Sequence, residues 1–382
     1  MMFGAGRTIR HRVLLPLCGS RGMSSDGTGT VVPRKEVVDF VVRCMEAVGT
    51  KRPNALAIAE VLAEADYRGH YSHGLNRLEM YIHDLKMNIC DANVQPSILK
   101  ETAATAYVDG NNGLGPVVGN FCMDLAIKKA KEAGVGWVIA KGSNHYGIAG
   151  WYSIQAMQQG LIGMSMTNTS PLVAPTRAKK AALGTNPLTV AAPAKDGDSF
   201  LLDMATSAVA VGKIEMQKRK EEPIPKGWAI GPGGQMTTDP QTALMGALMP
   251  LGGAELHSGY KGYGLGLMVE LFCGILAGGS YGPNVRKWMS TAEEANLGQC
   301  FVALNPECFA PGYHDRLQDL MNFIRKMEPT EPHKPVLIAG DPEKIRMKEN
   351  DDRGGIQYHP NQMKACAKWA QDLKVSPPKT IA

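Results

Sequence analysis

His145 lies in a run of small residues between two apolar segments of different character. The preceding run, 135–140, is short and continuously apolar and predicts a buried strand, whereas 151–159 has the spacing of a helix. A histidine at such a strand-to-helix corner is exposed at the edge of a sheet, and its ordinary pKa lets it accept and donate a proton near neutral pH. His145 is therefore a candidate general acid and base. A loop histidine bonded to a backbone carbonyl is the alternative that this segment alone leaves open.

A second polar segment, 65–77, contains His70 and His73 and is interrupted by glycine. It lies inside a region, 32–88, whose apolar spacing is helical, and it is too polar to be only a connection between helices. We expect a loop that delivers side chains to a site. A zinc site formed by His70, His73 and a distant histidine is one alternative, and a non-catalytic ligand-binding protein is another.

Several segments have the residues of an anion or ribose site. Small or hydroxyl residues adjoin apolar runs at 168–171, 184–187 and 203–207, where backbone amides and hydroxyls can hold phosphates. Each segment alone is equally explained as an ordinary Asx or Ser/Thr turn. Lys261, flanked by glycines at the start of an apolar helix that continues to Leu276, predicts a bound anion.

The strand 105–109, the glycine-rich turn 110–119 and the helix 120–132 follow the order of a dinucleotide-binding fingerprint. The fit is poor because Pro116 removes a backbone donor and no second strand ends in an acidic residue about 20 residues further on. The pattern weighs against a Rossmann domain. The zinc-hydrolase motif HExxH is absent from the sequence.

Other patterns outline the remaining elements. Asn54 is positioned to cap the second N-terminal helix, and 213–240 is a polar excursion that reads as a lid or as an exposed loop. The other expected elements are a strand at 161–167, a helix containing Leu317 to Ile324, a strand at 336–339 and a helix at 363–373.

The composition narrows the function classes. The chain has 382 residues, 44% of them hydrophobic, which is enough for two domains or one elaborate domain, and no apolar run is long enough for a membrane span. The net charge of +5 becomes nearly neutral without the N-terminal arginines, so no basic surface calls for nucleic acid or membrane. The eight cysteines are scattered, which is typical of reduced thiols in an intracellular protein.

Residues 1–24 carry Arg7, Arg10, Arg12 and Arg21, and no acidic residue precedes Asp26. A basic segment without acids is similar to a mitochondrial transit peptide, and we expect it to be cleaved or disordered and to direct the protein to mitochondria. The alternative is an extension ahead of a cytosolic protein.

Taken together, a set of motifs carries a family resemblance that covers roughly 33–375. In order they are Ser72-His73-Gly74 with Arg77, 142–147, 167–171, 184–187, 203–207, Gly227-Trp228-Ala229, 237–240 and 261–264. The set resembles the malate/L-lactate dehydrogenase family, which includes ureidoglycolate and sulfolactate dehydrogenases and piperideine-2-carboxylate reductases.

The resemblance implies an α/β (α+β) protein with a non-Rossmann, NAD(P)-binding mixed-sheet domain and a helical lobe built from both chain ends. The implied division is 1–30 as targeting or disordered segment, 31–100 as N-terminal helical lobe, 101–312 as cofactor domain and 313–376 as the segment that completes the lobe. It also implies a homodimer, NAD or NADP as cofactor and a small carboxylate as substrate.

Carried over motif by motif, the resemblance makes His145 the proton acceptor in alcohol oxidation. Ser72, His73 and Arg77 would lie at substrate and nicotinamide. The implied cofactor contacts are Thr169, Asp203, Met204, Ala205, Lys261, Gly340, Asp341 and Pro342. The chemistry fits, because a 2-hydroxy acid that loses a hydride needs a base, which His145 can supply, and a carboxylate anchor, which Arg77 can supply. Reduction of a cyclic imino acid is the alternative reaction.

Three positions depart from the family pattern. Tyr260 stands where histidine is usual, Gly231 replaces a common aspartate, and Ala339-Gly340-Asp341 replaces Pro-Gly-Glu. The first and third place cofactor contacts in question, whereas Gly231 is expected to affect only its loop.

Overall fold

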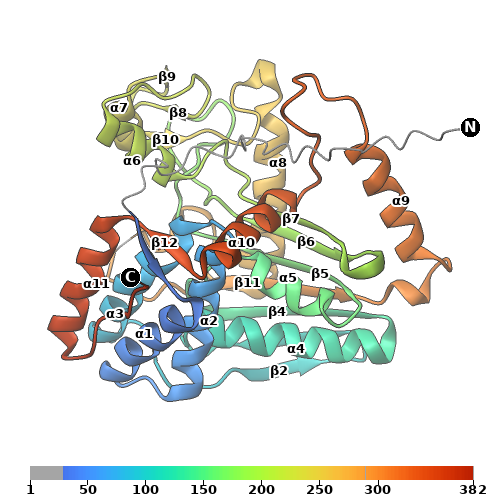
Figure 1. The fold of residues 1–382 in the computed structure, drawn as a ribbon, viewed down its shortest axis with the longest axis horizontal. Coiled ribbons are helices and arrows are strands. Elements are labelled where there is room, and N and C mark those ends of the chain that lie inside the picture. Colours follow the sequence, from blue (N-terminus) through green and yellow to red (C-terminus); the bar gives the residue numbers. More distant parts are fainter. Residues whose placement is uncertain (1–28, 289, 382) are drawn as a thin grey trace, which may run out of the picture.

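A seven-stranded mixed sheet forms the centre of the computed structural model, which describes residues 29–288 and 290–381 (Figure 1). The strand order is β2-β3-β4-β11-β5-β6-β7, and only β3 and β4 run parallel. The strands are β2 (Ser97–Glu101), β3 (Thr105–Asp109), β4 (Val135–Ser143), β5 (Ile162–Thr167), β6 (Leu188–Pro193), β7 (Ser199–Met204) and β11 (Leu297–Leu304). A largely antiparallel sheet is incompatible with a Rossmann domain, as the poor fingerprint indicated.

The central strands are the most buried. In β11, every residue from Leu297 to Ala303 is buried between β4 and β5. The predicted strands at 105–109, 135–140 and 161–167 are confirmed as β3, β4 and β5. Short apolar runs of this length are typical of strands that are covered on both faces.

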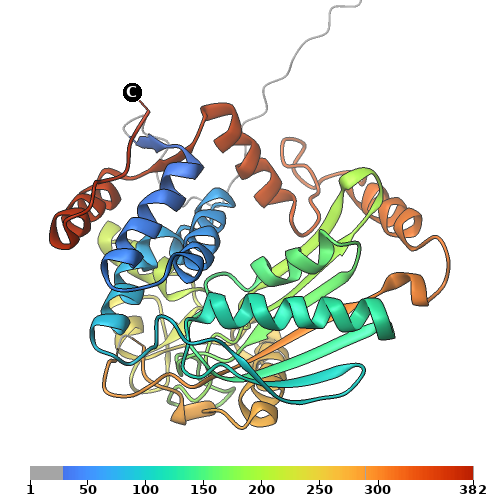
Figure 2. The same cartoon turned by 90° about the horizontal axis from the view of Figure 1, so that it is seen from below.

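Helices cover both faces of this sheet. On one face lie α4 (Gly115–Ala133) and α5 (Gly150–Met157), side by side in Figures 1 and 2, with a shared core that includes Cys122, Tyr152 and Phe301. On the other face, α8 (Gly259–Glu270) and its π-helical continuation η5 (Leu271–Ile275) pack through Val269 and Cys273. The apolar helix expected from Gly259 to Leu276 is thus confirmed.

Both ends of the chain meet in a helical lobe, as expected. It contains α1 (Arg34–Ala47), α2 (Arg52–Tyr67) and α3 (Leu78–Lys86), joined by α11 (Pro360–Leu373) and by the short pair β1 (Thr30–Val32) and β12 (Ile356–Tyr358). One apolar core links Phe40, Ile58 and Leu78 to Cys366 and Trp369. Figure 2 shows the C-terminal helix beside the N-terminal ones.

Two further C-terminal helices lie elsewhere. α9 (Tyr313–Arg325) packs beside the β6–β7 turn, on the side of the molecule opposite α11 in Figure 1, and His314 bonds the Pro193 carbonyl oxygen. α10 (Asp341–Arg353) bridges towards α2. The expected domain boundaries at 30, 100 and 312 stay a prediction.

The polar excursion at 213–240 was expected as a lid or an exposed loop; the structure corrects the loop, and the lid stays a prediction. It is a small packed unit of α6 (Val211–Lys220), α7 (Pro240–Met245) and the three-stranded sheet β10 (Ala247–Leu248), β8 (Ala229–Ile230), β9 (Met236–Thr237). Its own core contains Ile214, Ile224 and Leu248. Strands of two residues are too short to be recognised from alternation of polarity.

Three local predictions were wrong. Asn54 does not cap α2, which begins at Arg52; its side chain instead donates to the Ala92 carbonyl oxygen at 2.9 Å. The helix expected from residue 120 already begins at Gly115, with Pro116 in the first turn where a missing N–H is harmless. Residues 336–339 form no strand; their backbone bond to β7 runs from the Leu201 N–H to the Ala339 carbonyl oxygen, at 3.0 Å.

In the described part of the chain no helix is long and apolar enough to cross a membrane. The seven cysteines of that part are free thiols, and all except Cys308 are buried, as expected. Cys18 and the four N-terminal arginines lie outside the described residues, so the predicted targeting segment receives no structural account.

Candidate active site

His145 lies between the end of β4 and the start of α5, at the expected strand-to-helix corner. The loop is fixed by close packing at Gly147, whose φ of 79° favours glycine and whose Cα leaves no room for a Cβ against Val61 of α2. The half-buried imidazole thus sits where the sheet domain meets the helical lobe.

Tyr81 of α3 holds the inner nitrogen of this imidazole. The Tyr81 hydroxyl lies 2.7 Å from His145 Nδ1 and 3.2 Å from the His145 carbonyl oxygen, and the Gly147 N–H donates to Nδ1 at 3.3 Å. The hydroxyl can therefore donate to an unprotonated Nδ1, or accept from a protonated Nδ1 while donating to the carbonyl. The Gly147 bond forms only in the tautomer whose Nδ1 is unprotonated, whereas the tautomer that donates from Nδ1 to Tyr81 leaves Nε2 free to accept a proton from a ligand.

The segment expected to deliver side chains, 65–77, folds as the end of α2 followed by the 3-10 turns η1 (Tyr71–His73) and η2 (Leu75–Arg77). The Ser72 hydroxyl lies 2.8 Å from His73 Nδ1, and Arg77 Nε donates to the Ser72 carbonyl oxygen at 2.6 Å. Since Nε is occupied, the two terminal nitrogens of Arg77 remain to pair with a carboxylate.

Buried Asp66 fixes this segment to the C-terminal part of the chain. Its Oδ2 accepts from the Leu75 N–H at 2.8 Å and from the Tyr358 hydroxyl at 2.7 Å. Burial raises the pKa of Asp66 to about 7. At Gly74 a Cβ would collide with the Asp66 carboxylate, so this glycine is required by a close approach.

The structure brings the expected substrate residues together. The rings of His73 and His145 stack with centroids 5.8 Å apart. Burial, then the positive charge of Arg77 and the neighbouring His70, lower the pKa of His73 to about 3; burial, His73, Arg77 and Arg286 lower the pKa of His145 well below its ordinary value. Both imidazoles are therefore neutral at pH 7, beside the cation Arg77.

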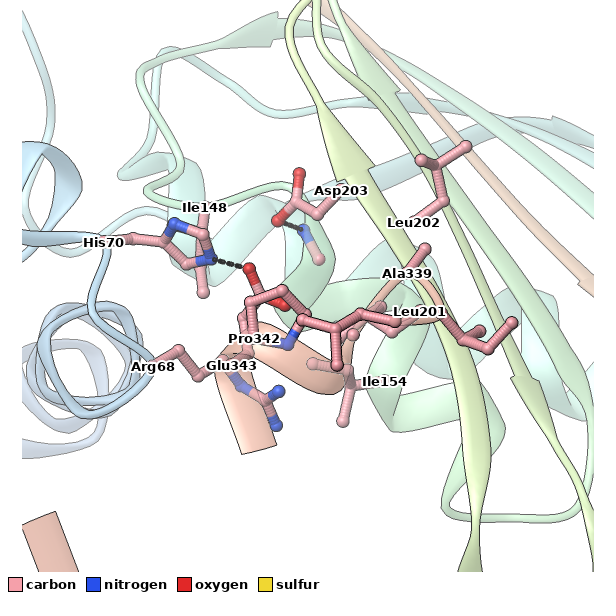
Figure 3. A pocket seen from close by; sticks show the side chains of 14 residues that line it. Arg68, His70, Ile148, Ile154, Leu201, Leu202, Asp203, Ala339, Pro342 and Glu343 are labelled. Carbon is pink, nitrogen blue, oxygen red and sulfur yellow. Dashed lines mark hydrogen bonds and ion pairs between the residues drawn. The ribbon is translucent and has the colours of Figure 1, made fainter. Parts of the chain in front are cut away.

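A cavity of about 310 Å³ adjoins this cluster (Figure 3). Its walls include Ile148 and Gly150, just after His145, and Asp203 of β7, whose Oδ2 accepts from the Gly150 N–H at 2.9 Å. In Figure 3 the His70 ring points towards Glu343, with Nε2 and Oε1 3.6 Å apart. Burial raises the pKa of Asp203.

Some expected cofactor residues line this cavity and others do not. Gly340 and Pro342 join Asp203 in its wall. The Asp341 carboxylate instead binds Arg325, at 2.6 and 2.9 Å, and accepts from the Ile338 N–H, so it shapes the turn from behind. Met204 and Ala205 continue from Asp203 at the end of β7.

Thr169 belongs to a second cradle, where the turns 168–171 and 184–187 meet. Its hydroxyl is 3.3 Å from that of Thr185, and Gly184 has no space for a Cβ beside it. Glu270 of α8 anchors both turns by accepting from the side chains of Asn168 at 2.9 Å and Asn186 at 2.8 Å.

Lys261 and two of the departures lie at the periphery. Lys261 and Tyr260 are exposed in the first turn of α8, and within the described residues Lys261 forms no salt bridge. Gly231 lies in the turn between β8 and β9, where its N–H donates to the Gln235 carbonyl oxygen at 2.9 Å, consistent with a role confined to that loop.

The zinc alternative finds no third ligand. His70 faces Glu343 whereas His73 faces Ser72 and His145, and among the described residues no group of three potential ligands is assembled. The sequence interpretation missed Tyr81, Asp66 and Trp288, and it left the acid Glu343 unnoticed. Of these residues, only Tyr81 could have been found from the sequence, because it follows Arg77 by four residues and therefore lies on the same face of a helix.

Residues 32–366 match the family described as malate/L-lactate dehydrogenase. The chain belongs to this family. A malate dehydrogenase of Pyrococcus abyssi is 42% identical over 314 residues, which make up 81% of this chain and 86% of that protein. An L-sulfolactate dehydrogenase of Methanocaldococcus jannaschii is 40% identical over 315 residues, with 82% and 89% covered. The solved structure of malate dehydrogenase from Pyrococcus horikoshii OT3 matches with a TM-score of 0.85 and 36% identity, covering 94% of this chain and 99% of that one.

Family membership confirms the expected enzyme class, an NAD(P)-dependent dehydrogenase of 2-hydroxy acids. The residues present fit such a cofactor: the cavity is large enough for part of a dinucleotide, and it is bordered by the backbone of Gly340 and by Asp203. The hydroxyl cradle at Thr169 and Thr185 has the kind of groups that ribose or phosphate contacts require.

Proposed function

We propose that the protein oxidises a short 2-hydroxy acid, malate foremost, and reduces the corresponding 2-oxo acid, with His145 as proton acceptor and donor. The observation that carries this proposal is a neutral, half-buried histidine beside the cation Arg77, which forms no salt bridge within the described residues. The names of the relatives at 40 and 42% identity support malate or sulfolactate as substrate.

The residues divide the task as follows. Arg77 binds the substrate carboxylate with its terminal nitrogens and so places C2 near His145. His145 Nε2 accepts the hydroxyl proton, while Tyr81 stabilises the charged ring by accepting from Nδ1. His73, held by Ser72, closes the other side of the ring. Nicotinamide, when bound, supplies the acceptor for the hydride from C2.

The residues that we assign to cofactor binding are Asp203, Met204, Ala205, Gly340 and Pro342 around the cavity, Thr169 in the second cradle, and Lys261 as a charge at the rim. Asp341 acts by shaping its turn, because Arg325 occupies its carboxylate.

The proposal is tested by incubating the purified protein with NADH or NADPH and a panel of 2-oxo and cyclic imino acids, and following loss of nicotinamide absorbance. We expect oxaloacetate, sulfopyruvate or pyruvate to be reduced. If only the cyclic imino acids are reduced, they and not the 2-oxo acids are the substrate class. Cofactor binding without any turnover would reject the enzymatic function in favour of ligand binding.

We also propose that the segment before Met23 directs the protein to mitochondria. Its arginines and its lack of acids support this. A fusion of residues 1–40 to a fluorescent reporter should localise to mitochondria, and a diffuse cytosolic signal would refute the proposal.

A homodimer completes the proposed assembly. One face of α8 and η5 exposes the apolar side chains of Tyr260, Leu267, Leu271 and Ile275, a surface of the kind that marks protein interfaces. Light scattering should give about twice the chain mass of 41.1 kDa. A monomer mass at micromolar concentration would contradict the dimer.

A further inference from the structure

Trp288 borders two of the groups that the proposed substrate must bridge. Its ring centroid lies 5.2 Å from Arg77 Cζ and 5.9 Å from the centroid of the His145 ring, at 57° to that ring. It comes from a segment remote in sequence from both. The mechanism proposed above makes no use of it.

The segment that carries Trp288 is tied down two residues earlier. Arg286 pairs with Asp84 of α3 at 3.0 Å, and both side chains are nearly buried, with 10 and 13% exposure. The Ser170 hydroxyl donates to the Arg286 carbonyl oxygen at 2.7 Å, which links the segment to the cradle at 168–171. These contacts hold the backbone two residues before the indole, which lies beside the site with 39% of Trp288 exposed.

The geometry constrains how a substrate can lie. If the carboxylate binds Arg77 and the C2 oxygen binds His145 Nε2, the C1–C2 unit runs between two groups that both face the indole. Trp288 is then one wall of the substrate space, and the group attached to C2 has to pass beside it. An aromatic wall also favours one orientation of the guanidinium through its π face.

We propose that Trp288 is a specificity-determining residue that restricts the enzyme to short, slender 2-oxo and 2-hydroxy acids. This rests on the proposed function. The excluded class is acids with a bulky or aromatic group on C3, of which phenylpyruvate is the simplest example.

The test compares kcat/KM for oxaloacetate and phenylpyruvate in the wild type and in Trp288→Ala, Trp288→Phe and Trp151→Phe. Trp151 is a matched control, because its indole bonds Asn120 of α4 at 2.9 Å and it does not line the cavity. In Trp288→Ala the ratio for phenylpyruvate over oxaloacetate should rise by about 10- to 100-fold, with Trp288→Phe in between, since pocket walls discriminate on this scale. The control should keep the wild-type ratio.

An unchanged ratio in a Trp288→Ala protein that retains its affinity for NADH would overturn the proposal. If Trp288→Ala does not fold, Trp288→Phe decides. A phenylpyruvate-to-oxaloacetate ratio equal to that of the wild type would again overturn the proposed role of Trp288.

Binding separates this inference from the proposed reaction. Adding oxamate to the wild-type protein with NADH should quench tryptophan fluorescence, and Trp288→Phe should lose that change. Quenching that is lost in Trp288→Phe, without turnover of any acid, would support the role of Trp288 and reject the proposed reaction. Turnover with identical quenching in both proteins would support the reaction and reject the role of Trp288.

Discussion

His145→Ala is expected to lower kcat/KM for oxidation of the 2-hydroxy acid by about 10²- to 10⁴-fold, the usual contribution of a positioned general base. The affinity for NADH should change little, because His145 does not line the cavity to which we assign the cofactor. Stopped-flow or steady-state kinetics with fluorescence titration of NADH measures both quantities on one variant.

The pH profile distinguishes a base from a structural histidine. Burial and the charges of Arg77 and Arg286 hold the pKa of His145 well below its ordinary value of 6.5, so the ring is ready to accept a proton throughout neutral and mildly acidic pH. Oxidation measured as kcat/KM should therefore stay level down to pH 6.5 and fall only below it. In the reverse direction, where His145 has to be protonated first, the rate should rise as the pH falls.

Tyr81→Phe provides the graded comparison. It keeps the ring packed against His145 but removes the hydroxyl that supports Nδ1, so we expect a smaller loss of kcat than in His145→Ala and an unchanged NADH affinity. A folded His145→Ala enzyme with near-normal turnover would refute the assignment and move the base to His73.

Arg77→Lys should raise KM for the acid by about 10- to 100-fold, as expected when a charged hydrogen bond of about 1.5–3 kcal/mol is lost. Lysine retains the charge but lacks the planar fork, the Nε bond to the Ser72 carbonyl oxygen and the stacking on Trp288. The affinity for NADH should change far less.

Arg52→Lys is the matched control, since Arg52 pairs with Glu46 at the surface and its side chain is 74% exposed. Its kinetics should equal those of the wild type. If Arg77→Lys also retained the wild-type KM, Arg77 would not anchor the substrate.

The sequence predicts the part of the site that depends on neighbouring residues. The apolar run 135–140, the small residues around His145 and the helical spacing after it are all contained within β4, α5 and their corner. The motif set likewise places Ser72, His73 and Arg77 correctly beside His145, because each motif occupies one turn or strand end.

Other features depend on contacts between distant residues and leave no local pattern. Asp66 bonds Tyr358, 292 residues further along the chain, at 2.7 Å, and Trp288 lies beside Arg77 although it follows η5 in the sequence. The central strand β11 follows an irregular segment and was not predicted at all, although it pairs with both β4 and β5. Non-local pairing of this kind is decided by packing of the folded chain.

The error at 336–339 has a related cause. Four apolar residues before a turn match the pattern of a buried strand. The segment nevertheless makes one backbone bond to the edge strand β7, from the Leu201 N–H, and turns at Gly340, whose φ is 99°, so it forms a wall of the cavity instead. The same placement turns Asp341 to Arg325, which the family pattern of that turn does not reveal.

The central claim, transfer of a hydride between C2 of a 2-hydroxy acid and nicotinamide, is tested most directly with substrate deuterated at C2. The protein is incubated with C2-deuterated malate, sulfolactate or lactate and with NAD⁺ or NADP⁺, and the reduced cofactor is analysed by mass spectrometry. We predict that one of these acids transfers its deuterium completely to the nicotinamide ring. Reduced cofactor without deuterium, or no reduction with any of the acids, would contradict the account.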